Sequence, residues 1–302
     1  MLFDNSNINV DKLENQLLDQ LGIELSVLRL DLIHPIISGN KLFKLFYFLQ
    51  DAEKFPHKQV ITFGGAYSNH LVATAYACKL KGLKSIGIVR GEKTAKLSHS
   101  LQNCRQYGMQ LKFVSRRAYD QKEDVLFQEN LLKEFGEAVI IPEGGHSSLG
   151  AKGAALIMDH IDGSTTHICC ALGTATTVAG LLSAQKKEQQ IIAVPVLKGL
   201  DDIHKRIAHL LPDKKQENIV QIADNYHFGG YAKYSPELIA FMNDLYKKYQ
   251  LPTDFVYTAK MFFAVFDKIN KKEFSSGSKI VCIHTGGLQG NLSLPVNSLI
   301  FQ

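Results

Sequence analysis

The chain has 302 residues, 45% of them hydrophobic and 21% charged, which is the composition of an ordinary globular protein long enough for two domains. Its formal net charge of +5 is spread thinly, and the densest basic clusters, such as Lys186-Lys187 and Lys247-Lys248, are only pairs. This distribution gives no support for a nucleic-acid partner and favours at most a small anionic ligand.

The cellular compartment is indicated by the lack of a membrane-spanning or signal segment and by the pattern of cysteines. No apolar run approaches the roughly 20 residues that span a bilayer, and Met1-Leu2-Phe3-Asp4-Asn5 lacks a basic region followed by an apolar one. The cysteines are odd in number, show no Cys-x-x-Cys spacing and lie mostly in apolar context: Cys78, Cys104, Cys169, Cys170 and Cys282. We expect a cytoplasmic protein without a membrane partner, and buried free thiols rather than metal ligands or disulfides.

In chain order, helix-like and strand-like segments alternate almost throughout. The expected helices are 11–21, 41–50, 71–80, 97–106 and 120–134, and the expected strands are 27–32, 60–63, 86–89, 111–114, 139–141, 167–172, 191–197, 219–223 and 280–284. Alternation of this kind predicts an α/β fold of parallel sheets, with helices on both faces and ligands at the carboxyl ends of the strands. Glycine-rich breaks near Gly39 and Gly145 suggest a domain boundary at each.

A short turn, Ser38-Gly39-Asn40-Lys41, brings a lysine to the start of an apolar helix. Glycine and asparagine tolerate a positive φ, so the backbone can bend sharply before Lys41. The positive end of a helix and apolar walls both disfavour an ammonium group, so the amine can attack a carbonyl and form a Schiff base. The alternative is an ordinary solvated lysine beside a loop.

Three glycine-rich turns follow strands, where a parallel sheet places its ligands. The segment 173–180 can hold a phosphate on its amides and hydroxyls at a helix start, and because it is neither Gly-x-Gly-x-x-Gly nor a P-loop, a monophosphate fits better than a dinucleotide. The alternative is a plain connection with capping threonines. The segment 65–70 offers amide donors suited to a carboxylate, and 284–287 is the third turn.

Together these motifs resemble one family. They are Ser38-Gly39-Asn40-Lys41, Gly64-Gly65-Ala66-Tyr67-Ser68-Asn69-His70, Pro142-Glu143-Gly144-Gly145, Val256-Tyr257-Thr258-Ala259-Lys260 and His284-Thr285-Gly286-Gly287. They look like the pyridoxal-phosphate enzymes of the 1-aminocyclopropane-1-carboxylate deaminase and D-cysteine desulfhydrase family. The resemblance implies a tryptophan-synthase-β type of fold, a larger cofactor domain (1–43 and 150–302), a smaller inserted domain (44–149) and a homodimer.

The resemblance also implies roles for individual residues. Lys41 would hold pyridoxal phosphate through a Schiff base and act as the acid-base group at the substrate α-carbon, and Asn69 would bond the cofactor's phenolic oxygen. The amides around Ser68 and His70 would hold the substrate carboxylate, Thr285 would contact the substrate, and Thr258 would donate to the ring nitrogen. The phosphate would lie on Gly173, Thr174, Ala175, Thr176 and Thr177, within reach of Lys44. Tyr231 and Tyr257 match two active-site tyrosines, with core aromatics as the alternative.

Two departures from the family bear on function. Ala175 stands where relatives usually carry glycine, which restricts φ in the phosphate turn, and Val72 stands where they often carry arginine. Three hypotheses compete: β-elimination from D-cysteine or a similar amino acid to give pyruvate, ammonia and sulfide; deamination of 1-aminocyclopropane-1-carboxylate; and a catalytically silent carrier or sensor of pyridoxal phosphate. The threonines at 258 and 285 and the histidine at 70 resemble the desulfhydrase branch, so we expect the first.

Overall fold

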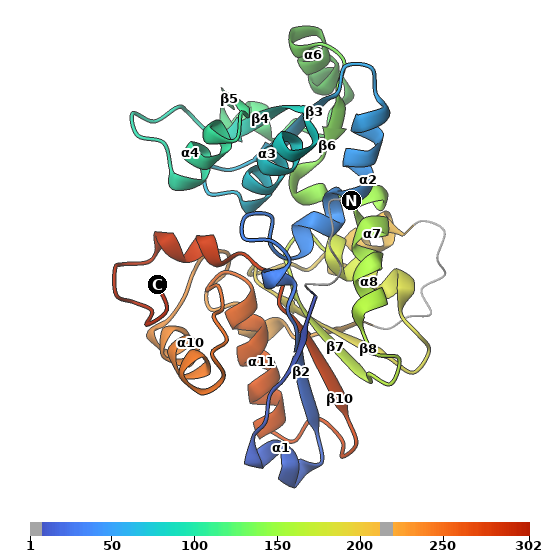
Figure 1. The fold of residues 1–302 in the computed structure, drawn as a ribbon, viewed down its shortest axis with the longest axis vertical. Helices are drawn as coiled ribbons and strands as arrows, with labels where there is room; N and C mark the ends of the chain where they lie inside the picture. Colours follow the sequence, from blue (N-terminus) through green and yellow to red (C-terminus); the bar gives the residue numbers. More distant parts are fainter. Residues whose placement is uncertain (1–7, 212–219) are drawn as a thin grey trace.

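The computed structural model describes residues 8–211 and 220–302, which form two sheets, one above the other in Figure 1. The larger sheet has the order β1-β2-β10-β7-β8-β9, and the smaller has the order β5-β4-β3-β6. The strands are β1 (Val10–Lys12), β2 (Glu24–Leu28), β3 (Gln59–Gly64), β4 (Lys84–Arg90), β5 (Gln110–Val114), β6 (Val139–Ile141), β7 (His167–Leu172), β8 (Gln190–Pro195), β9 (Val220–Ile222) and β10 (Lys279–Ile283). The N-terminal segment Met1 to Asn5 and residue Ile219 of one expected strand lie outside the described residues.

Helices cover both sheets. They are α1 (Gln16–Leu21), α2 (Asn40–Lys54), α3 (Asn69–Lys81), α4 (His99–Gln106), α5 (Arg116–Tyr119), α6 (Val125–Phe135), α7 (Ser148–Ala155), α8 (Thr176–Ala184), α9 (Ile203–Leu210), α10 (Pro236–Tyr249) and α11 (Thr258–Asn270). The larger sheet is buried between α7 and α8 on one face and α11 on the other, where two separate apolar clusters form. None of the described helices is long and apolar enough to cross a membrane.

The predicted α/β class is confirmed by the strand pairing. Strands pair in parallel throughout the described residues, except that β1 pairs antiparallel with β2. Every residue of β3 is buried, because helices shield both faces of a parallel sheet from water. All five cysteines are free and buried, so that prediction is confirmed as well.

The structure corrects three expected elements, each at its beginning or end. The helix expected over 11–21 is a short strand, β1, followed by α1, because the Asn15 side chain accepts the N–H of Leu17 and starts the helix there. The strand expected over 27–32 ends at Leu28, and Leu30–Leu32 forms a 3₁₀ turn. The helix expected over 120–134 begins at Val125, behind the capping side chain of Asp124.

Two helices connect the sheets. All strands of the smaller sheet lie within residues 59–141, and the predicted limits of the inserted domain, 43/44 and 149/150, fall inside α2 and α7. These helices pack so closely that a Cβ on Gly153 would lie 2.2 Å from the carbonyl oxygen of Phe43. The domain limits stay a prediction, since two continuous helices cross them.

Candidate active site

A cavity of about 480 Å³ opens between the carboxyl ends of the two sheets. Parallel strands direct the helix starts that follow them toward one edge, which is where such a fold places its ligands. The cavity brings together all but one of the residues singled out from the sequence: Lys41, Lys44, Ser68, Asn69, His70, Gly173, Thr174, Ala175, Thr176, Thr177, Tyr231, Tyr257 and Thr285. The exception is Thr258.

Lys41 reaches the cavity because of the glycine two residues before it. Gly39 has a φ of +73°, and a Cβ there would lie 1.8 Å from the carbonyl oxygen of Thr285, so no other residue fits. The Lys41 Nζ donates to Asn40 Oδ1 at 2.8 Å. Burial lowers the pKa of Lys41 to about 8, although Asp254 and Cys170 act in the opposite direction. A useful fraction of this amine is therefore neutral and nucleophilic near neutral pH.

A second lysine lies one helical turn further on. Lys44 is only 4% exposed, and burial, then the neighbouring Lys41, lower its pKa well below the ordinary value. It makes no hydrogen bond or ion pair with the described residues. Buried cations are usually paired, so this wall of the cavity suits an anion.

The turn between β7 and α8 supplies donors for that anion. Ala175 adopts a left-handed conformation (φ 64°, ψ −14°). The turn therefore keeps a shape that favours glycine, and the alanine is strained in it. No side chain caps α8, and the N–H groups of Thr176, Thr177 and Val178 have no acceptor in the described chain. The uncapped positive end of a helix is a ready site for a phosphate.

The threonine hydroxyls at this turn are held in place. Thr177 Oγ1 accepts from Asn40 Nδ2 at 2.8 Å, and Thr174 and Thr176 are hydrogen-bonded to each other at 3.1 Å. Because Thr177 acts as an acceptor toward Asn40, its own hydrogen stays available for an anion. The turn and the lysine-bearing helix are thus connected directly.

The opposite wall is the turn between β3 and α3. Ser68 caps this helix, accepting the N–H of Leu71 at 3.3 Å, whereas the N–H groups of Asn69 and His70 have no acceptor among the described residues. Two free amides at a helix start suit a carboxylate. The side-chain Asn69 Oδ1 is also buried without a partner.

The protonation state of His70 follows from its partner. The hydroxyl of Thr62 donates its one hydrogen to the carbonyl of Ile141 at 2.9 Å, so His70 Nε2, 2.9 Å from the same hydroxyl, must donate to it. Burial, and then Lys44 and Lys41, lower the pKa of His70 well below its ordinary value. The ring is therefore neutral, and its Nδ1 is a buried acceptor without a partner in the described chain.

Two tyrosines in contact with each other line the cavity, and one of them lies over Lys41. The ring of Tyr257 lies 5.9 Å from Lys41 Nζ and meets the ring of Tyr231 edge to face, with 6.0 Å between centroids. Burial, helped by the Tyr231 hydroxyl and the Asp254 carboxylate, raises the pKa of Tyr257 well above its ordinary value. Tyr257 is therefore held as a neutral phenol that can donate a hydrogen bond.

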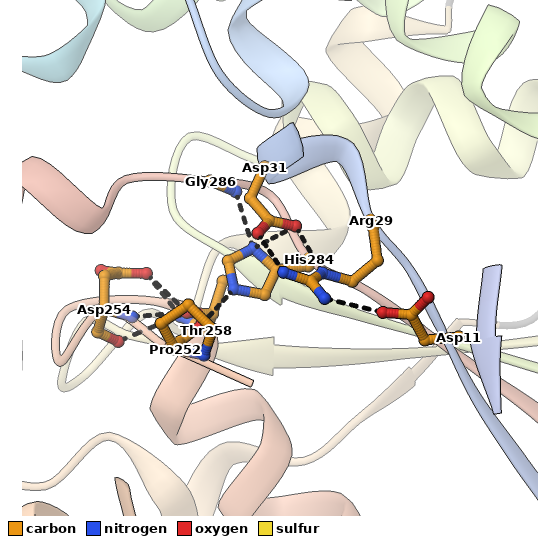
Figure 2. A network of polar contacts seen from close by, with 8 residues as sticks. All are labelled: Asp11, Arg29, Asp31, Pro252, Asp254, Thr258, His284 and Gly286. Atoms are coloured by element: carbon orange, nitrogen blue, oxygen red, sulfur yellow. Dashed lines mark hydrogen bonds and ion pairs between the residues drawn. The ribbon is translucent and has the colours of Figure 1, made fainter. Parts of the chain in front are cut away.

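Thr258 does not belong to the cavity lining, and its contact with the ring nitrogen stays a prediction. Thr258 is fully buried, its hydroxyl donates to Asp254 Oδ1 at 2.8 Å, and it accepts the N–H of Asp254 at 2.8 Å (Figure 2). A hydroxyl carries one hydrogen, so Thr258 cannot also donate to a ring nitrogen in this arrangement. Val72 is likewise outside the cavity and is buried in an apolar cluster of the smaller sheet.

A buried network behind the cavity was not anticipated. Arg29 pairs with Asp31 and Asp11, both at 2.7 Å, and Asp31 lies 3.4 Å from His284 Nδ1, one residue before Thr285 (Figure 2). Other cavity residues that the sequence reasoning missed are Arg90, Glu143, Arg206 and Gln289. Only Glu143 carried a signal, since it belongs to a quoted motif.

These features define a class of protein. A buried low-pKa lysine, an uncapped helix start that suits a phosphate, and parallel strands around one cavity are what an enzyme needs to bind a phosphorylated carbonyl cofactor through an imine. The chain belongs to the family described as "Pyridoxal-phosphate dependent enzyme", whose model matches residues 12–286. The predicted fold type is thereby confirmed, and so is the predicted cofactor.

Two proteins of known name and one crystal structure are similar to this chain over most of its length. A protein of Thermotoga maritima provisionally named 1-aminocyclopropane-1-carboxylate deaminase is 32% identical over 91% of this chain and 92% of its own length. The D-cysteine desulfhydrase of Klebsiella pneumoniae is 27% identical over 90% of this chain and 89% of its own. A crystal structure described as an ACC deaminase homologue superposes with a TM-score of 0.79 at 28% identity, covering 94% of this chain and 90% of that one.

The residues present fit pyridoxal phosphate. The cavity has the volume of a small-molecule site, and the free amides of α8 together with Lys44 match a phosphate dianion. The unpartnered Asn69 can pair with the phenolic oxygen through its amide nitrogen, since the orientation of a side-chain amide follows its partners. Lys41 supplies the amine. When bound, this cofactor withdraws electrons from the substrate α-carbon.

Proposed function

We propose that the protein is a lyase that removes a polar β-substituent from a small amino acid, with D-cysteine as the model substrate. One observation supports the choice: three polar side chains, Ser68, His70 and Thr285, belong to the lining of the cavity. Burying a hydrocarbon ring against such groups leaves them without partners, whereas a thiol or hydroxyl can satisfy them.

The chain's own residues would divide the work as follows. The amides of Asn69 and His70 hold the substrate carboxylate, and Lys41 Nζ takes the α-proton because its pKa of about 8 suits a base near neutral pH. Tyr231 and Tyr257, a hydroxyl pair kept neutral by burial, would donate a hydrogen bond to the departing sulfur. The Cα–H and Cβ–S bonds break, sulfur leaves as hydrosulfide, and water converts the remaining aminoacrylate to pyruvate and ammonia.

A second candidate is deamination of 1-aminocyclopropane-1-carboxylate. The name of the Thermotoga maritima relative favours it, at 32% identity. One argument against it is weaker as well, because the Thr258 hydroxyl that would meet the ring nitrogen already donates to Asp254. The remaining support for β-elimination is the polarity of His70 and Thr285.

The experiment is a substrate panel assayed for sulfide and pyruvate with purified, cofactor-loaded protein. D-Cysteine or a related β-substituted amino acid should be turned over faster than the cyclopropane substrate. Thr285→Leu should shift the ratio of kcat/KM values toward the cyclopropane by about tenfold, since one buried polar group contributes roughly 1–3 kcal/mol of discrimination. Faster ring opening than sulfide release by the wild type would replace this proposal with the second candidate, and no turnover on the whole panel would favour the silent carrier.

A homodimer and the two-domain division at 43/44 and 149/150 are also proposed, on the family resemblance and on the two sheets. Light scattering of the purified protein would decide the first. A monomer at micromolar concentration would contradict it.

A further inference from the structure

A fully buried lysine lies outside the cavity lining. Lys260, in α11, has no exposed surface, and its Nζ donates to the backbone carbonyls of His227 at 2.8 Å and Gly230 at 2.7 Å. It has no ion pair with a carboxylate in the described part of the chain. Lysine is almost never buried in this way without a reason, and the proposed chemistry makes no use of it.

The two carbonyls belong to the loop that carries Tyr231. The loop bends sharply through three residues of positive φ, Phe228 (51°), Gly229 (90°) and Gly230 (116°), of which only Phe228 is in a conformation unusual for its residue type. Two backbone hydrogen bonds of the loop, from Gly230 N–H to His227 and from Lys233 N–H to Gly230, end on the same two carbonyls that Lys260 contacts. The ammonium group therefore ties together both ends of the segment that precedes Tyr231.

Tyr231 depends on this backbone for its position. The residue is 52% exposed, so apart from its contact with Tyr257 its ring has little packing to hold it, and its place depends on the loop backbone. Tyr257, its partner in the edge-to-face contact, is held differently: Asp254 Oδ2 accepts the N–H of Tyr257 at 2.9 Å and that of Val256 at 3.0 Å. A buried anion thus fixes one tyrosine and a buried cation fixes the other.

The two buried charges also support each other. Burial lowers the pKa of Lys260 to about 8, and Asp254 acts against that shift by favouring the ammonium form. Asp254 likewise favours the ammonium form of Lys41.

We propose that Lys260 is a positioning residue that holds Tyr231 against Tyr257, while Asp254 holds Tyr257, whose ring lies over Lys41. This inference rests on the proposed function in so far as the tyrosines act on substrate. It differs from a space-filling role for Lys260, in which its loss would lower stability but leave the Tyr231 loop as it is.

The first test measures the loop without any turnover. In the cofactor-loaded protein, Lys260→Met should raise the hydrogen exchange of the amides in residues 227–233 by at least about tenfold. The variant removes the two charged hydrogen bonds that the wild type must break to open this loop, so opening becomes easier. Lys268→Met is the matched control: this buried lysine lies about two turns further along α11, pairs with Glu273 and does not line the cavity. Unchanged exchange in Lys260→Met, or an equal rise in both variants, overturns the proposal.

The second test uses kinetics and is read only if the substrate panel gives turnover. Lys260→Met should lower kcat by roughly 10²-fold, as expected for a misplaced catalytic group, with little change in KM. In a Tyr231→Phe background the same change should have almost no further effect, because both variants disable one unit. Fully additive losses overturn the proposal.

If Lys260→Met does not fold, Lys260→Gln takes its place, because it keeps two N–H donors without the charge. Lys260→Gln should show a smaller rise in hydrogen exchange. Exchange equal to that of the wild type in this variant contradicts the role of the charge.

Discussion

The two helix starts that face the cavity differ in one respect that explains what each can bind. The turn before α8 has no side-chain cap, keeps three free N–H groups and lies near Lys44, whereas the turn before α3 is capped by Ser68 and keeps two free N–H groups. An uncapped start with a lysine beside it matches a dianion, and a capped start matches a single carboxylate. The cap thus sets how much negative charge each end accepts.

The largest effect should come from Lys41, which lies between the two turns. Lys41→Ala should abolish the covalent link to pyridoxal phosphate and lower turnover by at least about 10³-fold. Lys41→Arg should fail as completely, because a guanidinium keeps the charge but is not nucleophilic. Borohydride reduction followed by mass spectrometry measures the link.

The neighbouring lysine provides the control for this prediction. Lys44→Ala should keep the reducible link at Lys41 and only weaken cofactor affinity, since Lys44 faces the phosphate turn. A link formed on another lysine in Lys41→Ala would show that the central assignment is wrong.

Variants in one turn at a time test the difference between the turn before α8 and the turn before α3. Thr176→Val with Thr177→Val should weaken cofactor affinity at least about tenfold, because hydrogen bonds to a dianion contribute about 1.5–3 kcal/mol each and 1.4 kcal/mol is a factor of ten. Ser68→Ala should leave cofactor affinity nearly unchanged and cost about 1 kcal/mol of stability through loss of the cap. Equilibrium titration of cofactor and thermal unfolding measure the two effects; equal losses of affinity would contradict the difference between the turns.

A smaller effect is expected from pH on cofactor uptake by the cofactor-free protein. Only the neutral form of Lys41 attacks the cofactor carbonyl, and its pKa is about 8. The neutral fraction grows as pH rises, so the uptake rate should increase about tenfold per unit below pH 8 and level off above it. Stopped-flow absorbance gives this profile, and a continued rise to pH 10 would mean that burial does not lower the pKa.

The smallest effect concerns the strain in the phosphate turn. Ala175 has a left-handed φ of 64°, which costs an alanine about 1–2 kcal/mol. Ala175→Gly removes this cost but adds chain entropy to the unfolded state, so a net gain of about 0.5–1 kcal/mol in the free energy of unfolding is expected. Thermal unfolding should show a Tm higher by roughly 2 °C. A lower Tm would mean that the alanine methyl group contributes more through packing than the strain costs.

Much of the fold was predictable because it depends on short-range patterns. Alternating apolar segments specify a parallel sheet, and the strands at 139–141 and 167–172 match the structure to the residue. Site residues were predictable where they follow strands or begin helices, as Lys41 and Thr176 do, since those positions meet at one edge of the sheet.

Other features depend on contacts between residues far apart in the sequence. The segment at 10–12 pairs with β2 instead of continuing a helix, because an available strand edge satisfies its backbone groups. Val72 has the spacing of a site residue, yet it lies on the side of α3 that packs into the smaller sheet.

The sequence by itself therefore determined the fold class through its local periodicity, and it pointed to the cofactor family and to Lys41 through motifs that resemble that family. Only the tertiary structure decided where single hydrogens go. The Thr258 hydroxyl donates to Asp254, the His70 Nε2 donates to Thr62, and Lys260 donates to two distant carbonyls. A donor bonds to whichever acceptor lies nearest in space with the right direction, and motif spacing alone does not specify that direction.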